Sequence, residues 1–209
     1  MAEACGRSWI IERRGDLETL WDQIGEDDFG DDERLPYWVE LWPSSLVLAQ
    51  WLADHRQDVA GRICVDIGCG LGLTALVGSW LGARVAAFDY EFQPLPYAKR
   101  NAQLNDVPQP LWLQTDWRAP GLAPGRAAFA WGGDIMYELR FVEPVTEFLD
   151  TVLAPGGRAW IAEPGRNIRQ PFMDHARARG FSCERVLTRR FTHQRHPVTV
   201  HILELVKPA

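Results

Sequence analysis

The sequence contains few cysteines, hardly any lysine and no long hydrophobic run. Its four cysteines, Cys5, Cys64, Cys69 and Cys183, include no CxxC pair, which argues against a zinc site or a disulfide framework. No apolar stretch approaches the roughly 20 residues that a membrane helix needs. Residues 1–7 also lack the apolar segment of a secretory signal. We therefore expect a cytoplasmic protein that holds no metal and does not enter membranes.

Charge is unevenly distributed along the 209 residues, whose formal net charge is −6. Six acids fall between Glu26 and Glu33, whereas nine arginines lie between Arg158 and Arg195. Both clusters are typical of solvated surface, and the acidic run is also suited to steering a basic substrate. The arginines are spread over several elements with little aromatic interleaving, which disfavours nucleic acid as a partner.

The first forty residues differ in composition from the rest of the chain. They are polar, acidic and turn-rich, and one short helix is expected near 16–24. We expect residues 1–40 to form an acidic N-terminal segment that packs on a single domain, 41–209. Ser44 or Ser45 can cap a helix that runs to Leu52, with Pro43 just ahead of it.

From residue 62 onward, short apolar runs alternate with helical stretches. We expect strands at 63–66, 84–89, 111–115, 128–135 and 158–163, helices at 73–81, 95–104, 141–152 and 170–179, and final strands at 185–191 and 198–206. The alternation predicts an α/β fold with a doubly wound parallel sheet of seven strands. The last two strands have no helix between them and predict an antiparallel C-terminal hairpin at the edge of the sheet.

A glycine-rich turn joins the first strand to the first helix of this pattern. Gly68, Gly70 and Gly72 occupy alternate positions, where glycine lets the backbone turn tightly and approach a ligand closely. Leu73 is too bulky for a nicotinamide-type fingerprint, and the Asp66 carboxylate would repel a pyrophosphate. A cofactor with positive sulfonium and ammonium groups suits that acid better.

A second acid lies where the second predicted strand ends. Asp89 follows the loop by about twenty residues, a position from which a carboxylate can accept hydrogen bonds from both ribose hydroxyls. The alternative interpretation is an ordinary α/β glycine turn with a helix-capping acid.

Together with the loop and Asp89, three further motifs make the chain similar to a known family. These are Pro36–Pro43, which ends in a Trp-Pro pair, Asp134-x-x-Tyr137 after the fourth strand, and Glu163-Pro164-Gly165-Arg166 after the fifth. The chain resembles the seven-strand class I methyltransferases, and more narrowly the family-16 group of protein-lysine methyltransferases. The resemblance covers roughly 36–166. It implies a Rossmann-like fold, S-adenosyl-L-methionine as cofactor, and a monomer that N-methylates a basic side chain of a protein substrate.

The resemblance also implies roles for particular residues. Asp134 and Tyr137 would face the methyl donor and the acceptor amine and act as catalytic residues. Asp116 would bond the adenine amino group, Trp117 would pack on its ring, and Trp42 would cover the cofactor. The expected cofactor-binding residues are Trp42, Asp66, Gly68, Cys69, Gly70, Gly72, Asp89, Tyr90, Asp116, Trp117 and Asp134.

Several alternatives stay open at this point. Trp117 could simply be a core residue, and Glu163 could merely pair with Arg166. The chain could be a small-molecule N-methyltransferase or a non-catalytic module that binds S-adenosylmethionine, although a binding module would not require the Asp134–Tyr137 pair. A nucleotide-dependent oxidoreductase is disfavoured by Asp66 and by the residue after the last glycine of the loop.

Overall fold

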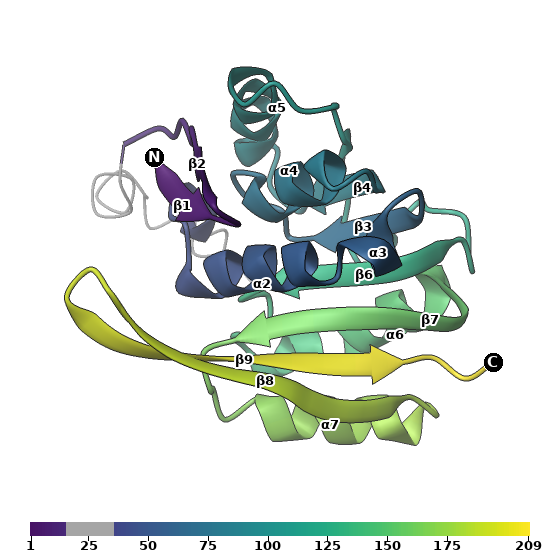
Figure 1. Cartoon of the computed structure of the whole chain (residues 1–209). Helices are drawn as coiled ribbons and strands as arrows, with labels where there is room; N and C mark the ends of the chain where they lie inside the picture. The colour runs from purple at the N-terminus through teal and green to yellow at the C-terminus, as the bar shows by residue number, and fades with distance from the viewer. Residues whose placement is uncertain (16–35) are drawn as a thin grey trace, which may run out of the picture.

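The protein is described here by a computed structural model that covers residues 1–15 and 36–209 (Figure 1). The short helix expected near 16–24 and the acidic run from Glu26 to Glu33 lie outside the described residues. The described elements are β1 (Ala2–Ala4), β2 (Arg7–Trp9), η2 (Tyr37–Val39), α2 (Pro43–Asp54), α3 (Arg56–Val59), β3 (Ile63–Ile67), α4 (Leu73–Trp80), β4 (Arg84–Asp89), α5 (Pro94–Leu104), β5 (Leu111–Gln114), β6 (Ala127–Gly133), η3 (Leu139–Phe141), α6 (Val142–Val152), β7 (Leu153–Glu163), α7 (Arg169–Ala178), β8 (Ser182–His193) and β9 (His196–Val206).

Seven of the strands form one sheet, in the order β5-β4-β3-β6-β7-β9-β8. The five strands from β5 to β7 are parallel, and β9 runs antiparallel to both of its neighbours. The order reverses between β3 and β6, because the chain first builds outward to β5 and then returns to the other side of β3. The predicted doubly wound sheet with an antiparallel C-terminal hairpin is confirmed.

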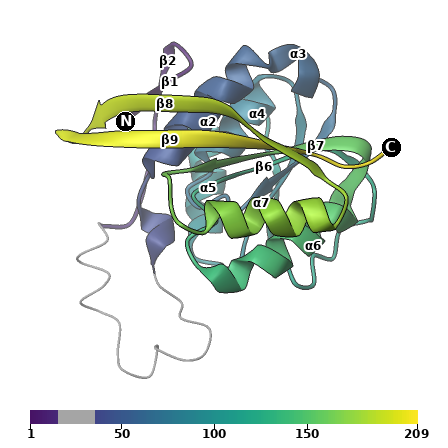
Figure 2. The ribbon, with the colours of Figure 1, turned by 90° about the horizontal axis from the view of Figure 1, so that it is seen from below.

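Helices cover both faces of the sheet. The helices α2, α3, α4 and α5 lie on one face, and α6 and α7 lie on the other (Figures 1 and 2). Side chains of β3 point alternately to the two faces of the sheet, each of which carries a hydrophobic core. Cys64 packs in the core under α2 and α4, whereas Val65 and Ile67 pack in the core under α6 and α7. Such burial on both faces explains why the parallel strands appear as short uninterrupted apolar runs.

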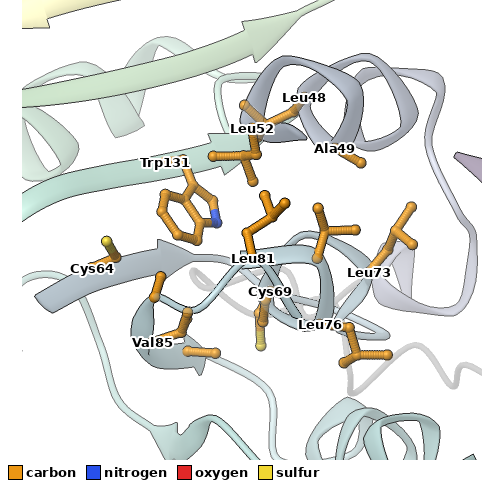
Figure 3. Close-up of a cluster of buried hydrophobic side chains, with 14 of the residues drawn as sticks. Leu48, Ala49, Leu52, Cys64, Cys69, Leu73, Leu76, Leu81, Val85 and Trp131 are labelled. Atoms are coloured by element: carbon orange, nitrogen blue, oxygen red, sulfur yellow. The ribbon is translucent and has the colours of Figure 1, made fainter. Parts of the chain in front are cut away.

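One large indole fills the centre of the core beneath α2 and α4. Trp131, from β6, is fully buried and lies among Leu52 of α2, Cys64 of β3 and Leu81 (Figure 3). A Cβ atom added to Gly78 of α4 would lie 2.7 Å from the Trp131 ring, so the helix approaches this closely only because it carries glycine there.

The N-terminal hairpin was not predicted. β1 and β2 pair antiparallel, and Trp9 is fully buried against the Trp80 ring at 5.8 Å, with its Nε1 donating to the Ala4 carbonyl. Strands of three residues are too short to produce a visible period, so the segment looked like a turn-rich stretch.

Two buried asparagines of α5 join the N-terminal segment to the rest of the domain. Asn105 exchanges hydrogen bonds with the backbone of Ile10, at 2.9 and 2.8 Å. Asn101 accepts from Glu12 N at 2.7 Å and donates to the Leu71 carbonyl in the glycine-rich turn at 3.0 Å. Residues before the first predicted helix thereby help to hold this turn.

Two of the boundaries that differ from the predicted ones do so for local reasons. β6 ends at Gly133 rather than at residue 135, because Asp134 adopts a left-handed backbone with φ of 58°. The helix α6 ends at Val152, shortly before the predicted breaker at Pro155–Gly157. The chain continues directly into β7, which begins at Leu153 and includes the breaker residues.

Candidate functional site

A cavity lies at the carboxyl ends of β3, β4 and β6, beside the point where the strand order reverses. Ligands of open α/β sheets bind at such an edge. The cavity is bounded by the glycine-rich turn, by residues 88–91, by residues 133–137 and by the segment that leads into α2. Its lining residues are Tyr37, Trp38, Glu40, Leu41, Trp42, Ser45, Gly68, Cys69, Gly70, Leu71, Gly72, Leu73, Thr74, Phe88, Asp89, Tyr90, Glu91, Trp117, Gly133, Asp134, Ile135 and Tyr137.

The turn between β3 and α4 depends on its three glycines. Gly68, Gly70 and Gly72 have φ values of 61°, 50° and 89°, a backbone region that side chains disfavour. A Cβ added to Gly68 would lie 2.9 Å from the Ile135 side chain, and one added to Gly72 would lie 2.9 Å from Ala98 Cβ. The turn is therefore packed from both sides, and its backbone remains exposed to the cavity.

Asp89 holds this turn from the end of β4. Its Oδ2 accepts the backbone N–H of Gly70 at 2.8 Å, and its Oδ1 accepts that of Glu91 at 3.0 Å. Burial raises the pKa of Asp89 to about 6, although these two N–H donors act in the opposite direction. Each carboxylate oxygen keeps a lone pair with which it can accept a hydroxyl group from a ligand.

Asp66 lies behind the cavity wall and does not line the cavity itself. Its Oδ2 accepts the hydroxyl of Thr74 at 2.7 Å, and Thr74 does line the cavity. Its Oδ1 is buried and accepts no hydrogen bond within residues 1–15 and 36–209. Burial raises the pKa of Asp66 to about 7, and the Thr74 hydroxyl and the nearby Trp131 indole oppose this shift. A buried carboxylate with an unused oxygen is a favourable neighbour for a cation.

A row of aromatic rings forms part of the cavity wall. The Tyr37 ring lies 6.1 Å from Trp42 and 5.5 Å from Tyr137, and Phe141 connects Tyr137 to Trp117 at 4.8 and 5.2 Å. All of these are edge-to-face contacts, a favourable geometry for paired rings. Trp42 Nε1 also donates to the Tyr37 carbonyl at 2.9 Å, which fixes the segment before α2.

Asp134 and Tyr137 lie together at the mouth of the cavity, after β6. The Asp134 side chain is 6% exposed, and its Oδ1 accepts from the Arg166 guanidinium at 3.1 Å. Desolvation raises the pKa of Asp134, and Arg166 opposes this shift. Burial also raises the pKa of the Tyr137 hydroxyl. Tyr137 is therefore neutral near pH 7.

The contacts of Glu163 differ from the suggested pairing with Arg166. Glu163 is buried, and its Oε2 accepts the backbone N–H groups of Gly165 at 2.6 Å and of Arg166 at 2.9 Å. Its ion pair is with the Arg169 guanidinium, at 3.4 Å. Glu163 thus shapes the turn after β7, and the side chain of Arg166 extends to Asp134 instead.

The remaining predicted residues lie in different surroundings. Trp117 and Tyr90 are half-buried in the cavity lining. Asp116 is not in the lining, because its carboxylate turns back to the Arg118 guanidinium at 2.7 Å and to the Arg118 N–H at 2.8 Å. Cys69 contributes to the lining and also belongs to the buried core.

Sequence reasoning missed two residues of the site. Thr74 is the first partner of Asp66, and a hydroxyl eight residues after an acid, in the first turn of the next helix, was the available signal. Arg166 was noticed only as part of its turn, and nothing in one sequence indicates that it reaches Asp134 across β6 and β7.

The charged side chains among the described residues of the cavity lining are all acidic. The lining carries the acids Glu40, Asp89, Glu91 and Asp134, and no lysine, arginine or histidine is among its described residues. Arg13 pairs with Glu40 from outside the lining. The electrostatic field of such a cavity favours cations and disfavours phosphates.

The fold places the chain in a definite class of proteins. The magnesium protoporphyrin IX methyltransferase from Synechocystis PCC 6803, solved with bound SAM, superimposes with a TM-score of 0.64 at 17% identity, over 94% of this chain and 99% of that one. The chain therefore has the seven-stranded methyltransferase fold. No family model matches the sequence.

Curated relatives give a narrower relationship. The chain is 31% identical to the electron transfer flavoprotein beta subunit lysine methyltransferase of Danio rerio, over 67% of this chain and 53% of the relative. It is 29% identical to the human histone-arginine methyltransferase METTL23, over 47% of this chain and 54% of the relative. The chain spans about half the length of these relatives. It is thus related in sequence to protein-lysine and protein-arginine methyltransferases, which confirms the resemblance drawn from its motifs.

Proposed function

We propose that the protein is an S-adenosylmethionine-dependent methyltransferase that transfers a methyl group to a nitrogen of a protein side chain, most specifically a lysine amine. The observation that carries the proposal is the cavity itself, acidic in its lining and walled by aromatic rings, at the carboxyl edge of the sheet. Both the methyl donor and an amine acceptor bear positive charge, and carboxylates and aromatic faces stabilise such charge.

The residues present fit S-adenosylmethionine. When bound, the cofactor supplies an electrophilic methyl group on a sulfonium. Asp89 would receive the ribose hydroxyls with the lone pairs left by its backbone partners. The exposed backbone of the turn at Gly70 would allow the cofactor to approach closely. The buried Asp66 carboxylate, which accepts the Thr74 hydroxyl, would stabilise the ammonium group of the cofactor. Trp117 and Tyr90 provide apolar surface for a base.

The acceptor end of the site must align and deprotonate an amine. A free lysine has a pKa near 10.4, so its neutral form costs roughly 4–5 kcal/mol at pH 7. Desolvation against Tyr137, Tyr37 and Phe141 reduces this cost, because it disfavours the ammonium. Asp134 orients the amine and accepts its departing proton. Its pairing with Arg166 reduces the extent to which Asp134 would stabilise the ammonium.

Substitution of the two mouth residues tests these roles. Asp134→Ala and Tyr137→Phe are both expected to lose methyl transfer to protein in a lysate. By calorimetry Tyr137→Phe should bind S-adenosylmethionine with near wild-type affinity, and Asp134→Ala should still bind it, more weakly, because one carboxylate of the cavity is removed. Peptide mass spectrometry of the wild-type product identifies the acceptor and separates lysine from arginine and from small molecules. Normal turnover in both variants would remove these residues from the mechanism. Tight binding of NAD or ATP, with none of S-adenosylmethionine, would end the proposal.

The expected protein partner and location extend this proposal. Relatives that act on proteins support a protein acceptor rather than a small molecule. The monomeric state and the cytoplasmic location inferred from composition stay predictions, and gel filtration of the purified chain measures the first. No helix in residues 1–15 and 36–209 is long and apolar enough to cross a membrane.

A further inference from the structure

The last two strands form an arm that extends beyond the sheet. β7 pairs with β9 only as far as Glu163 opposite His201, whereas β8 and β9 continue to pair for five more positions, from Arg189 opposite Val200 to His193 opposite His196. We call these ten residues, 189–193 and 196–200, with the turn between them, the arm. It projects from the edge of the sheet at which β7 ends (Figure 1). This edge is also the one that holds the cavity.

The arm is positively charged in a chain that is negative overall. Between Arg185 and Leu203 the sequence contains no acidic residue, while the net charge of the whole chain is −6. Arg189, Arg190 and Arg195 are exposed, and none of them forms an ion pair with any part of the chain that the structure describes. By contrast, Arg166, Arg169, Arg177 and Arg179 each have a carboxylate partner.

Two adjoining grooves connect the arm with the cavity. The first is lined by Leu46, Val47, Arg189, Phe191 and His193 together with residues of the N-terminal hairpin. The second shares Leu46 and His193 with the first groove and shares Glu40, Leu41 and Leu71 with the cavity. The shared lining residues therefore mark a path along the surface from the arm to the cavity.

We propose that the arm and these grooves dock an extended, acidic segment of the protein that carries the acceptor nitrogen. This inference rests on the proposed function and adds a substrate class to it. Acidic side chains of the segment meet the guanidinium group of Arg189, which lines the first groove, and those of Arg190 and Arg195 elsewhere on the arm. Arginine binds carboxylates well, and none of the three pairs with a carboxylate among the described residues. Apolar side chains of the segment meet Phe191 and Leu46 in the groove.

The same surface is less suited to nucleic acid. The first groove is lined by the half-buried apolar residues Leu46 and Phe191 and the buried Val47, and it also contains the Glu3 carboxylate. A phosphate backbone would have to pass that carboxylate, whereas a peptide can place a neutral or basic residue there. A polypeptide with spaced acids therefore fits the groove better than a polyphosphate does.

Fluorescence anisotropy with the full chain tests the proposal without requiring turnover. The probes are two fluorescein-labelled peptides of about 15 residues, a length suited to extended recognition, and a single-stranded RNA of similar length. One peptide has a central lysine flanked by glutamates, and the other has glutamines at the same positions. The glutamate peptide is expected to bind about tenfold more tightly than the glutamine peptide at low salt, and this preference is expected to shrink as salt rises.

Matched charge reversals locate the binding surface. Arg189→Glu with Arg190→Glu is expected to weaken binding of the glutamate peptide about tenfold. Arg62→Glu with Arg84→Glu makes the same charge change at exposed positions on the opposite edge of the sheet and is expected to leave binding unchanged. Calorimetry with S-adenosylmethionine is expected to give the same affinity for both double variants.

Three results would overturn the proposal: equal binding of the two peptides, equal weakening by both double variants, or tighter binding of the RNA than of the glutamate peptide. The proposed methyl transfer is measured separately, with radiolabelled cofactor. A chain that binds the acidic peptide but transfers no methyl group would contradict the proposed function and leave the docking surface intact. A chain that methylates protein with no preference for acidic segments would contradict the docking surface and leave the proposed function intact.

Discussion

The carboxyl group of Asp66 makes the stability of this protein depend on pH in an unusual direction. Its pKa is raised from 3.8 to about 7 because the ionised group is buried, an effect that outweighs the opposing interactions with the Thr74 hydroxyl and the Trp131 indole. An unfolded chain ionises this group near pH 4, whereas the folded chain keeps it protonated up to about pH 7. Between these values the folded state binds more protons, so the free energy of unfolding falls as pH rises.

The size of the effect follows from the shift. At 1.36 kcal/mol for each pKa unit, ionised Asp66 destabilises the fold by about 4 kcal/mol above pH 7, and about 3 kcal/mol of this develops between pH 5 and pH 8. The Asp66→Asn variant keeps an oxygen for the Thr74 hydroxyl and never ionises. We expect its advantage over the wild type to grow by about 3 kcal/mol across that interval, in urea denaturation followed by tryptophan fluorescence.

Cofactor binding is expected to respond in the opposite sense. A positively charged ligand favours the ionised carboxylate, so wild-type affinity for S-adenosylmethionine should rise by up to about tenfold for each pH unit below 7 and then level off. Asp66→Asn should bind more weakly, with a flatter pH dependence. Asp58→Asn, at an exposed position far from the cavity, is the control and should follow the wild type in both assays. If Asp66→Asn keeps the wild-type pH slope of stability, burial of this charge is not what sets the slope.

Three further predictions concern the turn, the acceptor end and the N-terminal hairpin. Gly72→Ala should destabilise the fold by about 1–3 kcal/mol more than Gly82→Ala in urea denaturation. Both positions have positive φ, but only at Gly72 would the added Cβ lie 2.9 Å from a neighbour. Equal losses of stability would show that backbone strain alone matters. Arg166→Met leaves the Asp134 carboxylate without its cation, which favours the ammonium form of the bound acceptor, so the rise of kcat with pH should move about one unit upward; an unshifted profile with lower turnover would indicate a structural role. Trp9→Ala should cost about 3–5 kcal/mol in the same denaturation assay, because its indole is fully buried; a loss below about 1 kcal/mol would mean that the hairpin is not part of the cooperative fold.

The elements that the sequence predicted correctly are those with a strong local signal. The helix α6 has a regular apolar stripe from Val145 to Val152, and its observed bounds agree with the predicted ones to within one residue. β3 and β4 are short apolar runs with an acid at the penultimate or the last position, as strands buried on both faces and reaching a ligand edge should be. The glycine turn was recognised because positive φ at alternate positions demands glycine.

What the sequence could not predict depends on contacts between distant residues. The hairpin of β1 and β2 is stabilised by Asn101 and Asn105, almost a hundred residues away, and not by its own short pattern. The link between Asp134 and Arg166 bridges two strands and depends on the left-handed backbone at Asp134. The extension of β8 and β9 into an arm follows from where β7 stops, and neither strand signals this by itself.

The site contains three buried carboxylates that destabilise the fold when they ionise. Asp66, Asp89 and Asp134 lie at the ends of three neighbouring parallel strands, and burial raises the pKa of all three. Asparagine at each position would keep one oxygen that accepts a hydrogen bond, without burying negative charge. Only a ligand that brings positive charge recovers the lost free energy, so stabilisation by S-adenosylmethionine should exceed that by its uncharged-sulfur product S-adenosylhomocysteine, and the difference should widen from about pH 5 to pH 8 as the carboxyls ionise. A thermal-shift comparison of the two nucleosides measures this difference in stabilisation directly. Equal shifts at every pH would mean that the carboxylates do not interact with the charge on sulfur.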